Sequence, residues 1–202
     1  GAFHQPKLVL ADVSTLSSLP LRERNEGFAE VIKHAAIRDA DLFDLIAEAA
    51  DPSRPIDPEL IRRNVSIKAK IVEEDERETS GTRALLNFGH TIGHAIEASV
   101  GYGTLLHGEA ISLGTIAALR LSQSHADLSE DDAQVVTDAL NAFGLPSTLS
   151  DEISTEKVME RLARDKKFQS GAIRFVLIRR LGEAFVSDRI TSEAILETVE
   201  SL

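Results

Sequence analysis

Two histidines stand four residues apart in the segment 87–97, which reads Asn-Phe-Gly-His-Thr-Ile-Gly-His-Ala-Ile-Glu. In a helix, His90 and His94 project from the same face, and two imidazoles on one face suit a divalent metal. A zinc-protease helix needs Glu directly after its first histidine, and Thr91 stands there instead, which excludes that class. Because such histidine pairs also occur on ordinary surfaces and in cores, a metal site needs further ligands.

Two further candidate ligands lie outside this pair. His107 begins the next predicted helix, and a helical hairpin through the turn at 101–103 brings it back beside His90. Glu30 is an acid in the otherwise apolar segment 27–34, where it is either a salt-bridge partner for Lys33 or a ligand. Two imidazoles and one carboxylate leave an open coordination position, which is typical of catalytic zinc.

Basic and amide side chains accompany these candidates. Arg83 lies one turn before Asn87, on the helix that we expect to lead into His90, and Lys68 lies on the preceding predicted helix. Arginine holds a carboxylate with two parallel hydrogen bonds, while lysine and asparagine suit phosphate oxygens. Each charge alone is typical of a solvated surface, but together they indicate a pocket for a small, doubly anionic substrate beside a metal.

The elements that must position these residues are mostly helical. Apolar residues recur every three or four positions, and caps and breaks divide the pattern. We expect helices around 28–36 and 42–46, from Asp57 and Pro58 through 60–72, over 85–100 and 107–124, from Ser129 to about 143, from Ser154, and from Thr191 or Ser192. One strand signal at 173–178 precedes a turn and 184–186, which predicts a hairpin. The fold class is therefore mostly α, a single helical domain with a small antiparallel β element.

The amino-acid composition excludes some classes of binding partner. The chain has 202 residues, a formal net charge of -11 and no cysteine. An acidic protein without a basic run is not expected to bind nucleic acid or anionic membrane, and any metal must be held by imidazole and carboxylate. The lack of cysteines fits the cytoplasm, and neither a secretory signal nor a transmembrane segment is recognisable.

Five motifs together resemble the 3-dehydroquinate synthases of the sugar-phosphate cyclase superfamily. Their order and spacing agree with that family from the first residue to the last predicted helix. The motifs occupy 3–6 (Phe-His-Gln-Pro), 27–33 (Gly-Phe-Ala-Glu-Val-Ile-Lys), 83–97, 107–110 (His-Gly-Glu-Ala) and 165–167 (Asp-Lys-Lys).

The resemblance implies roles for individual residues. It implies a Zn²⁺ or Co²⁺ ion held by Glu30, His90 and His107. It implies substrate contacts, with the hydroxyls, carboxylate or phosphate, at Lys33, Lys68, Arg83, Asn87, His94 and one of Lys166 and Lys167. It also implies that NAD is touched by the segment Thr15, Leu16, Ser17 and Ser18.

The implied reaction belongs to the shikimate pathway of aromatic amino acid biosynthesis. It converts 3-deoxy-arabino-heptulosonate 7-phosphate to 3-dehydroquinate and phosphate, a carbon–oxygen lyase reaction in which NAD is reduced and then reoxidised. Members of the family have an N-terminal nucleotide-binding domain, and we expect it to be absent from 1–202, which is then the C-terminal domain. We therefore expect this chain to be inactive alone and the full-length enzyme to be a homodimer.

Three alternatives remain at this stage. Another sugar-phosphate cyclase is disfavoured by Arg83, Asn87 and His94, which suit a carboxylate and a phosphate. A metal-dependent polyol dehydrogenase would leave Arg83 and Lys68 without substrate partners. A non-catalytic helical module would require that Glu30 and the histidines bind no metal.

Overall fold

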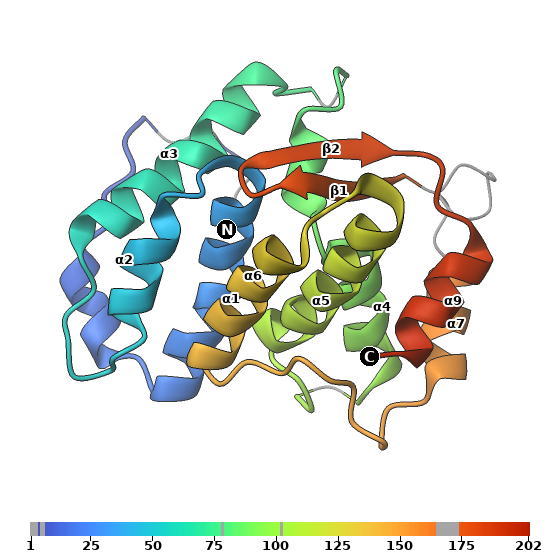
Figure 1. The fold of residues 1–202 in the computed structure, drawn as a ribbon. Coiled ribbons are helices and arrows are strands. Elements are labelled where there is room, and N and C mark those ends of the chain that lie inside the picture. Colours follow the sequence, from blue (N-terminus) through green and yellow to red (C-terminus); the bar gives the residue numbers. More distant parts are fainter. Residues whose placement is uncertain (1–3, 5–6, 78, 102, 165–173) are drawn as a thin grey trace.

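The computed structural model describes residues 4, 7–77, 79–101, 103–164 and 174–202 (Figure 1). It confirms the expected fold class, a mostly helical domain with one antiparallel hairpin in the described ranges. In chain order the elements are η1 (Val13–Ser18), α1 (Leu21–Arg38), α2 (Leu42–Ala49), α3 (Pro58–Glu74), η2 (Arg83–Asn87), α4 (His90–Ser99), α5 (His107–Ala126), α6 (Glu130–Ala142), α7 (Thr155–Arg164), β1 (Phe175–Arg180), β2 (Glu183–Ser187) and α9 (Ser192–Glu200).

Local chemistry explains several helix starts. Asp57 accepts a hydrogen bond from the backbone N–H of Glu59 at 2.8 Å, and Pro58 occupies the first turn of α3. Such side-chain acceptors satisfy N–H groups that have no partner within the helix. Ser129 caps α6 and Thr191 caps α9 in the same way, which confirms both predicted caps.

Helix α5 lies at the centre of the fold. It packs against α1, α4, α6, α9 and β1, and from Gly108 to Leu119 only Glu109 is not buried. The hairpin lies across one end of this assembly, with β1 against α5 and β2 against α1 (Figure 1). The backbone N–H of Ile178 in β1 donates to the hydroxyl of Ser122 in α5 at 3.1 Å. Helices α1 and α5 therefore form the frame on which the other elements are placed.

The prediction of one helix over 85–100 is wrong. The backbone forms the 3-10 helix η2, breaks at Phe88 and Gly89, and starts α4 at His90. Gly89 has a φ of 77°, in the left-handed region that a helix interior cannot contain. The break separates Arg83 and Asn87 from the two histidines, whereas His90 and His94 still share one helix.

The described residues contain no helix that is both long and apolar enough to cross a membrane.

Candidate functional site

Three histidines meet where α4 crosses the start of α5. Nitrogen atoms of His90, His94 and His107 all lie within 4.8 Å of one another. The ring centroids of His90 and His107 are 5.8 Å apart, so the return of the chain through the α4–α5 turn brings them together as predicted. Imidazoles this close are a suitable nitrogen donor set for a divalent transition metal.

Helix α1 brings Glu30 to the same place. Its Oε1 lies 3.1 Å from Nε2 of His90 and 3.9 Å from Nε2 of His107, while its Oε2 accepts from Nζ of Lys33 at 2.5 Å. Glu30 therefore forms the expected salt bridge with Lys33 and also faces the histidines, while its role as a metal ligand stays a prediction. Three separate helices supply the site.

His90 and His107 both turn Nε2 toward Glu30 and Nδ1 toward another oxygen. Nδ1 of His90 lies 3.1 Å from the carbonyl oxygen of Phe88, which only accepts, so Nδ1 is the donor in this contact and Nε2 is the ring nitrogen that faces Glu30. Nδ1 of His107 lies 3.3 Å from a carboxylate oxygen of Glu97, so this ring has the same orientation, with Nε2 toward Glu30. Oε1 of Glu30 is buried and has no hydrogen-bond donor of acceptable geometry. A cation between these atoms would satisfy all of them, and the residues present therefore fit a metal.

Neighbouring charges and burial shift the pKa of Glu30 and the pKa of His94. Burial raises the pKa of Glu30, but its contact with His90 and the charge of Lys33 lower that pKa by more, so the carboxylate is ionised. Burial and then the neighbouring His90 and His107 lower the pKa of His94, which favours its neutral ring. A carboxylate and neutral imidazoles are the forms that coordinate metals.

Lys33 lies beside Glu30, and Lys68 is close enough to affect the pKa of Lys33. Lys33 is 2% exposed, and burial lowers its pKa although Glu30 opposes this. Lys68 of α3 is exposed, and its positive charge contributes to lowering the pKa of Lys33 and the pKa of His34. Burial and the charge of Lys33 lower the pKa of His34 to about 4, so this ring is neutral, with Nδ1 2.5 Å from the side-chain oxygen of Asn64. The structure thus brings the predicted Lys33 and Lys68 near each other.

A buried carboxylate shapes the segment that carries Arg83. Oδ1 of Asp75 accepts backbone hydrogen bonds from Thr79 at 2.7 Å and Ser80 at 3.1 Å, and Oδ2 accepts from Gly81 at 2.9 Å and Arg83 at 3.1 Å. Burial raises the pKa of Asp75, but these bonds lower it by more. The ionised side chain therefore acts as the fixed centre of the loop that leads into η2.

The two predicted anion-binding side chains of η2 lie at its ends. The guanidinium of Arg83 donates to the carbonyl of Glu76 at 3.0 Å, and the side chain is partly exposed. Asn87 is exposed and lines a small crevice between η2, α4 and α5 together with Thr91. The left-handed turn at Gly89 places this end of η2 directly beside the start of α4.

Glycines set the distance between α4 and α5. A Cβ on Gly114 would lie 2.0 Å from the carbonyl oxygen of Gly89 and 2.6 Å from the backbone nitrogen of Gly93. No side chain fits in such a gap, so the two helix backbones touch. This close crossing brings His90 and His94 against the start of α5.

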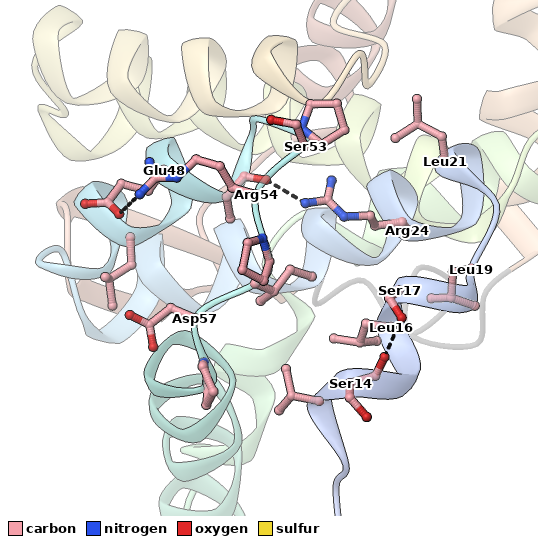
Figure 2. Close-up of a pocket in the computed structure, with 17 residues that line it drawn as sticks. Ser14, Leu16, Ser17, Leu19, Leu21, Arg24, Glu48, Ser53, Arg54 and Asp57 are labelled. Carbon is pink, nitrogen blue, oxygen red and sulfur yellow. Dashed lines mark hydrogen bonds and ion pairs between the residues drawn. The ribbon is translucent and has the colours of Figure 1, made fainter.

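A large pocket lies around the segment that the resemblance assigns to NAD. It has a volume of about 950 Å³ between η1 and the loop from α2 to α3 (Figure 2). Leu16 and Ser17 line it, whereas Thr15 and Ser18 do not. The hydroxyls of Thr15, Ser17 and Ser18 each donate to the backbone carbonyl three residues earlier, at Asp12, Ser14 and Thr15. None of the histidines or Glu30 lines this pocket, which is therefore separate from the candidate metal centre.

Two of the predicted site residues are not among the residues that the structure describes. Two carboxylates that contact the site were not predicted. Lys166 and Lys167 fall outside the described residues. The sequence interpretation missed Glu26, whose carboxylate binds the start of α5, and Glu97, which contacts His107. Helical spacing was an available signal for both, since Glu26 precedes Glu30 by four residues and Glu97 follows His94 by three.

Known sequences similar to this chain are 3-dehydroquinate synthases. The chain is 44% identical over 205 residues to the 3-dehydroquinate synthase of Nitrosomonas europaea and 40% identical over 208 residues to that of a Synechococcus strain. In both comparisons the whole chain is covered, together with 55% and 56% of the relative. The chain thus spans about half the length of the curated relatives that it matches.

Solved structures with the same fold are sugar-phosphate cyclases. A 2-epi-5-epi-valiolone synthase from Streptomyces hygroscopicus, solved with NAD⁺ and Zn²⁺ bound, matches the whole chain and 57% of its own length with a TM-score of 0.86 and 26% identity. A 2-deoxy-scyllo-inosose synthase complexed with carbaglucose-6-phosphate, NAD⁺ and Co²⁺ matches with a TM-score of 0.82 at 24% identity, which shows the shared fold.

The sequence pattern described as the 3-dehydroquinate synthase C-terminal region matches residues 27–168, which is more than half of the chain. This range runs from residue 27 within α1 through α7, and it includes Glu30 and all three histidines of the candidate metal centre. The chain therefore belongs to the 3-dehydroquinate synthase family.

Proposed function

We propose that this chain is the metal- and substrate-binding domain of a 3-dehydroquinate synthase, which converts 3-deoxy-arabino-heptulosonate 7-phosphate to 3-dehydroquinate and phosphate. The observation that carries the proposal is the convergence of Nε2 of His90 and Nε2 of His107 on the buried oxygen of Glu30 that has no hydrogen-bond partner. The 40–44% identity to synthases, against 26% to the valiolone synthase, favours this reaction over another cyclase reaction.

Glu30, His90 and His107 hold the proposed metal, Zn²⁺ or Co²⁺. A bound metal would supply Lewis acidity at a substrate hydroxyl, and bound NAD would supply reversible hydride chemistry at the carbon that carries this hydroxyl. His94 is close enough to be a further ligand, but its ring is exposed and therefore accessible to a substrate. We assign it to the substrate phosphate, so that substituting His94 leaves metal content intact and weakens substrate binding.

The remaining polar residues orient the substrate. Lys33 donates from a buried position next to Glu30 and lies near the substrate hydroxyls that approach the metal. Arg83 and Lys68 hold the substrate carboxylate, and Asn87 donates to the phosphate from the end of η2. Fixed donors of this kind lower the activation free energy by positioning and by stabilising negative charge.

Residues 1–202 supply only a few of the contacts that would bind the dinucleotide NAD. Leu16 and Ser17 form part of one pocket wall, and the polar groups of η1 already bond within η1. We propose that most NAD contacts come from an N-terminal nucleotide-binding domain, as the remaining length of the curated relatives allows. In that two-domain form the protein acts as a homodimer on a small anionic sugar phosphate, and residues 1–202 alone do not turn over.

Metal content of the purified chain tests the proposal. We expect about one Zn²⁺ or Co²⁺ per chain by elemental analysis, and loss of that metal in a double variant with His90→Ala and His107→Ala. The control is His125→Ala, because His125 is exposed near the end of α5 and takes no part in the site.

Either of two results would contradict the metal assignment. One is a wild-type chain that stays metal-free after incubation with excess Zn²⁺. The other is a double variant that retains its metal, since Glu30 and His94 would then suffice. Conversion of the sugar phosphate, assayed with a nucleotide-binding domain joined to the chain, tests the substrate separately from the metal.

A further inference from the structure

One face of α1 packs against the first turn of α5. Glu26 and Glu30 are one helical turn apart on α1, and they meet two consecutive residues of α5. Oε2 of Glu26 accepts from the backbone N–H of Gly108 at 2.7 Å, and Oε1 of Glu30 lies 3.9 Å from Nε2 of His107. The residue that anchors the backbone thus lies immediately beside the proposed ligand.

One turn before Glu26 on α1, Arg22 also contacts the first turn of α5. Nε and a terminal nitrogen of Arg22 donate to the two carboxylate oxygens of Glu109 at 2.7 and 2.8 Å. The same carboxylate accepts from the backbone N–H of Leu106 at 2.8 Å. Arg22 is exposed, so this pair contributes little to stability by itself, but it fixes the residues on either side of His107 in the same register.

We propose that Glu26 is a positioning residue for the metal centre, which sets the distance between the ligands Glu30 and His107 by holding the first turn of α5 on α1. The inference rests on the proposed metal site and assigns a role to a side chain that does not touch the metal itself.

The physical basis is the free N-terminus of α5. The first N–H groups of a helix have no partner within the helix, so an oxygen acceptor on a neighbouring side chain is needed to satisfy them when they are buried. Without Glu26 the N–H of Gly108 loses its acceptor at a buried position, and the first turn is free to shift or fray. His107 is the first residue of that turn, so a shift moves its imidazole directly.

A purely structural cap would stabilise the fold without affecting the metal centre. Co²⁺ distinguishes the two roles, because its visible absorption reports the number and geometry of ligands, whereas a melting temperature does not. Residues that orient metal ligands typically change affinity by about 10–100-fold when substituted.

The experiment titrates Co²⁺ into the chain and into Glu26→Ala, Glu26→Gln and Glu26→Asp, with circular dichroism and thermal melting to verify folding. Gln keeps an oxygen acceptor, while Asp keeps the charge but withdraws it by one methylene. The matched control is Glu59→Ala, which removes an exposed carboxylate from the first turn of α3.

We expect Glu26→Ala to raise the Kd for Co²⁺ by about 10–100-fold and to change the absorption spectrum. We expect Glu26→Gln to restore most of the affinity, and Glu59→Ala to match the wild-type chain. If Glu26→Ala does not fold, Glu26→Asp decides, with an expected increase in Kd and a changed spectrum.

Unchanged Kd and spectrum in a folded Glu26→Ala or Glu26→Asp variant would overturn the positioning role. So would a Glu26→Gln variant as weak as Glu26→Ala, because charge and not geometry would then be responsible. A wild-type chain that binds no Co²⁺ would instead contradict the proposed function, so the two failures are distinguishable.

Discussion

Replacing Gly108 with alanine tests whether α1 and α5 must touch for the metal centre to exist. A Cβ at this position would lie 2.0 Å from the carbonyl oxygen of Glu26. Ordinary contact begins near 3.4 Å, so the two backbones must separate by about 1.4 Å at this point. Metal–ligand distances tolerate only about 0.2 Å, and the displacement acts on His107, the adjacent residue.

We expect Gly108→Ala to remove His107 from the coordination sphere and to weaken Co²⁺ binding by at least about 100-fold, the upper end of what is found for outer-sphere changes. Overpacking should lower the free energy of unfolding by about 1–3 kcal/mol, which corresponds to roughly 2–12 °C in Tm for a chain of this size. The assays are a Co²⁺ titration followed by absorption, and a thermal melt of the metal-free protein.

Gly27→Ala is the matched control. Gly27 lies in α1 beside Glu26, and a Cβ there would meet no atom within 4 Å. Alanine in a helix interior should raise the free energy of unfolding by about 1 kcal/mol and leave the Kd for Co²⁺ unchanged. A folded Gly108→Ala variant with wild-type affinity and spectrum would refute the reasoning, because α1 and α5 would then not fix the position of His107.

Three further predictions concern other parts of the site. Gly114→Ala should destabilise the fold and weaken metal binding, since its Cβ would lie 2.0 Å from the carbonyl oxygen of Gly89; a thermal melt and a Co²⁺ titration test this. Glu97→Ala should weaken Co²⁺ binding by about 10–100-fold through loss of the carboxylate beside Nδ1 of His107, and unchanged affinity would contradict that role. Asp75→Asn should lower Tm at neutral pH and flatten its acid dependence. Because folding lowers the pKa of Asp75 below its ordinary value of 3.8, its stabilisation is present above that pH and is lost as pH falls through the folded pKa, which melts between about pH 5 and pH 2 would show.

Local patterns in the sequence were sufficient for the helices and the hairpin. The Asp57–Pro58 start, the Ser129 and Thr191 caps and the strand signal before the turn at 180–183 each depend on neighbours within a few residues. The helix break at Gly89 was not predicted, because apolar residues on both sides continue the helical rhythm. Its cause is tertiary, since a side chain at Gly89 would lie 2.6 Å from the hydroxyl oxygen of Thr115.

The sequence predicted some residues of the candidate site and missed others. Glu30, His90 and His107 were recognised by residue type and spacing, and the structure brings them together, although nothing yet tests them as ligands. The contact of Glu26 with Gly108 joins residues 82 positions apart, and no local pattern encodes such a distance. Lys166 and Lys167 stay predictions, because they lie outside the described residues.

The placement of the three proposed ligands on α1, α4 and α5 makes the metal a reporter of tertiary structure. An unfolded chain holds Glu30 and His107 far apart, so an ion has no preformed site to bind there. By mass action, a ligand that binds only the folded state at 100 times its Kd adds about 2.7 kcal/mol to the free energy of unfolding. Metal availability and folding yield should therefore rise together, and a cell short of zinc or cobalt should contain less folded protein as well as less active enzyme.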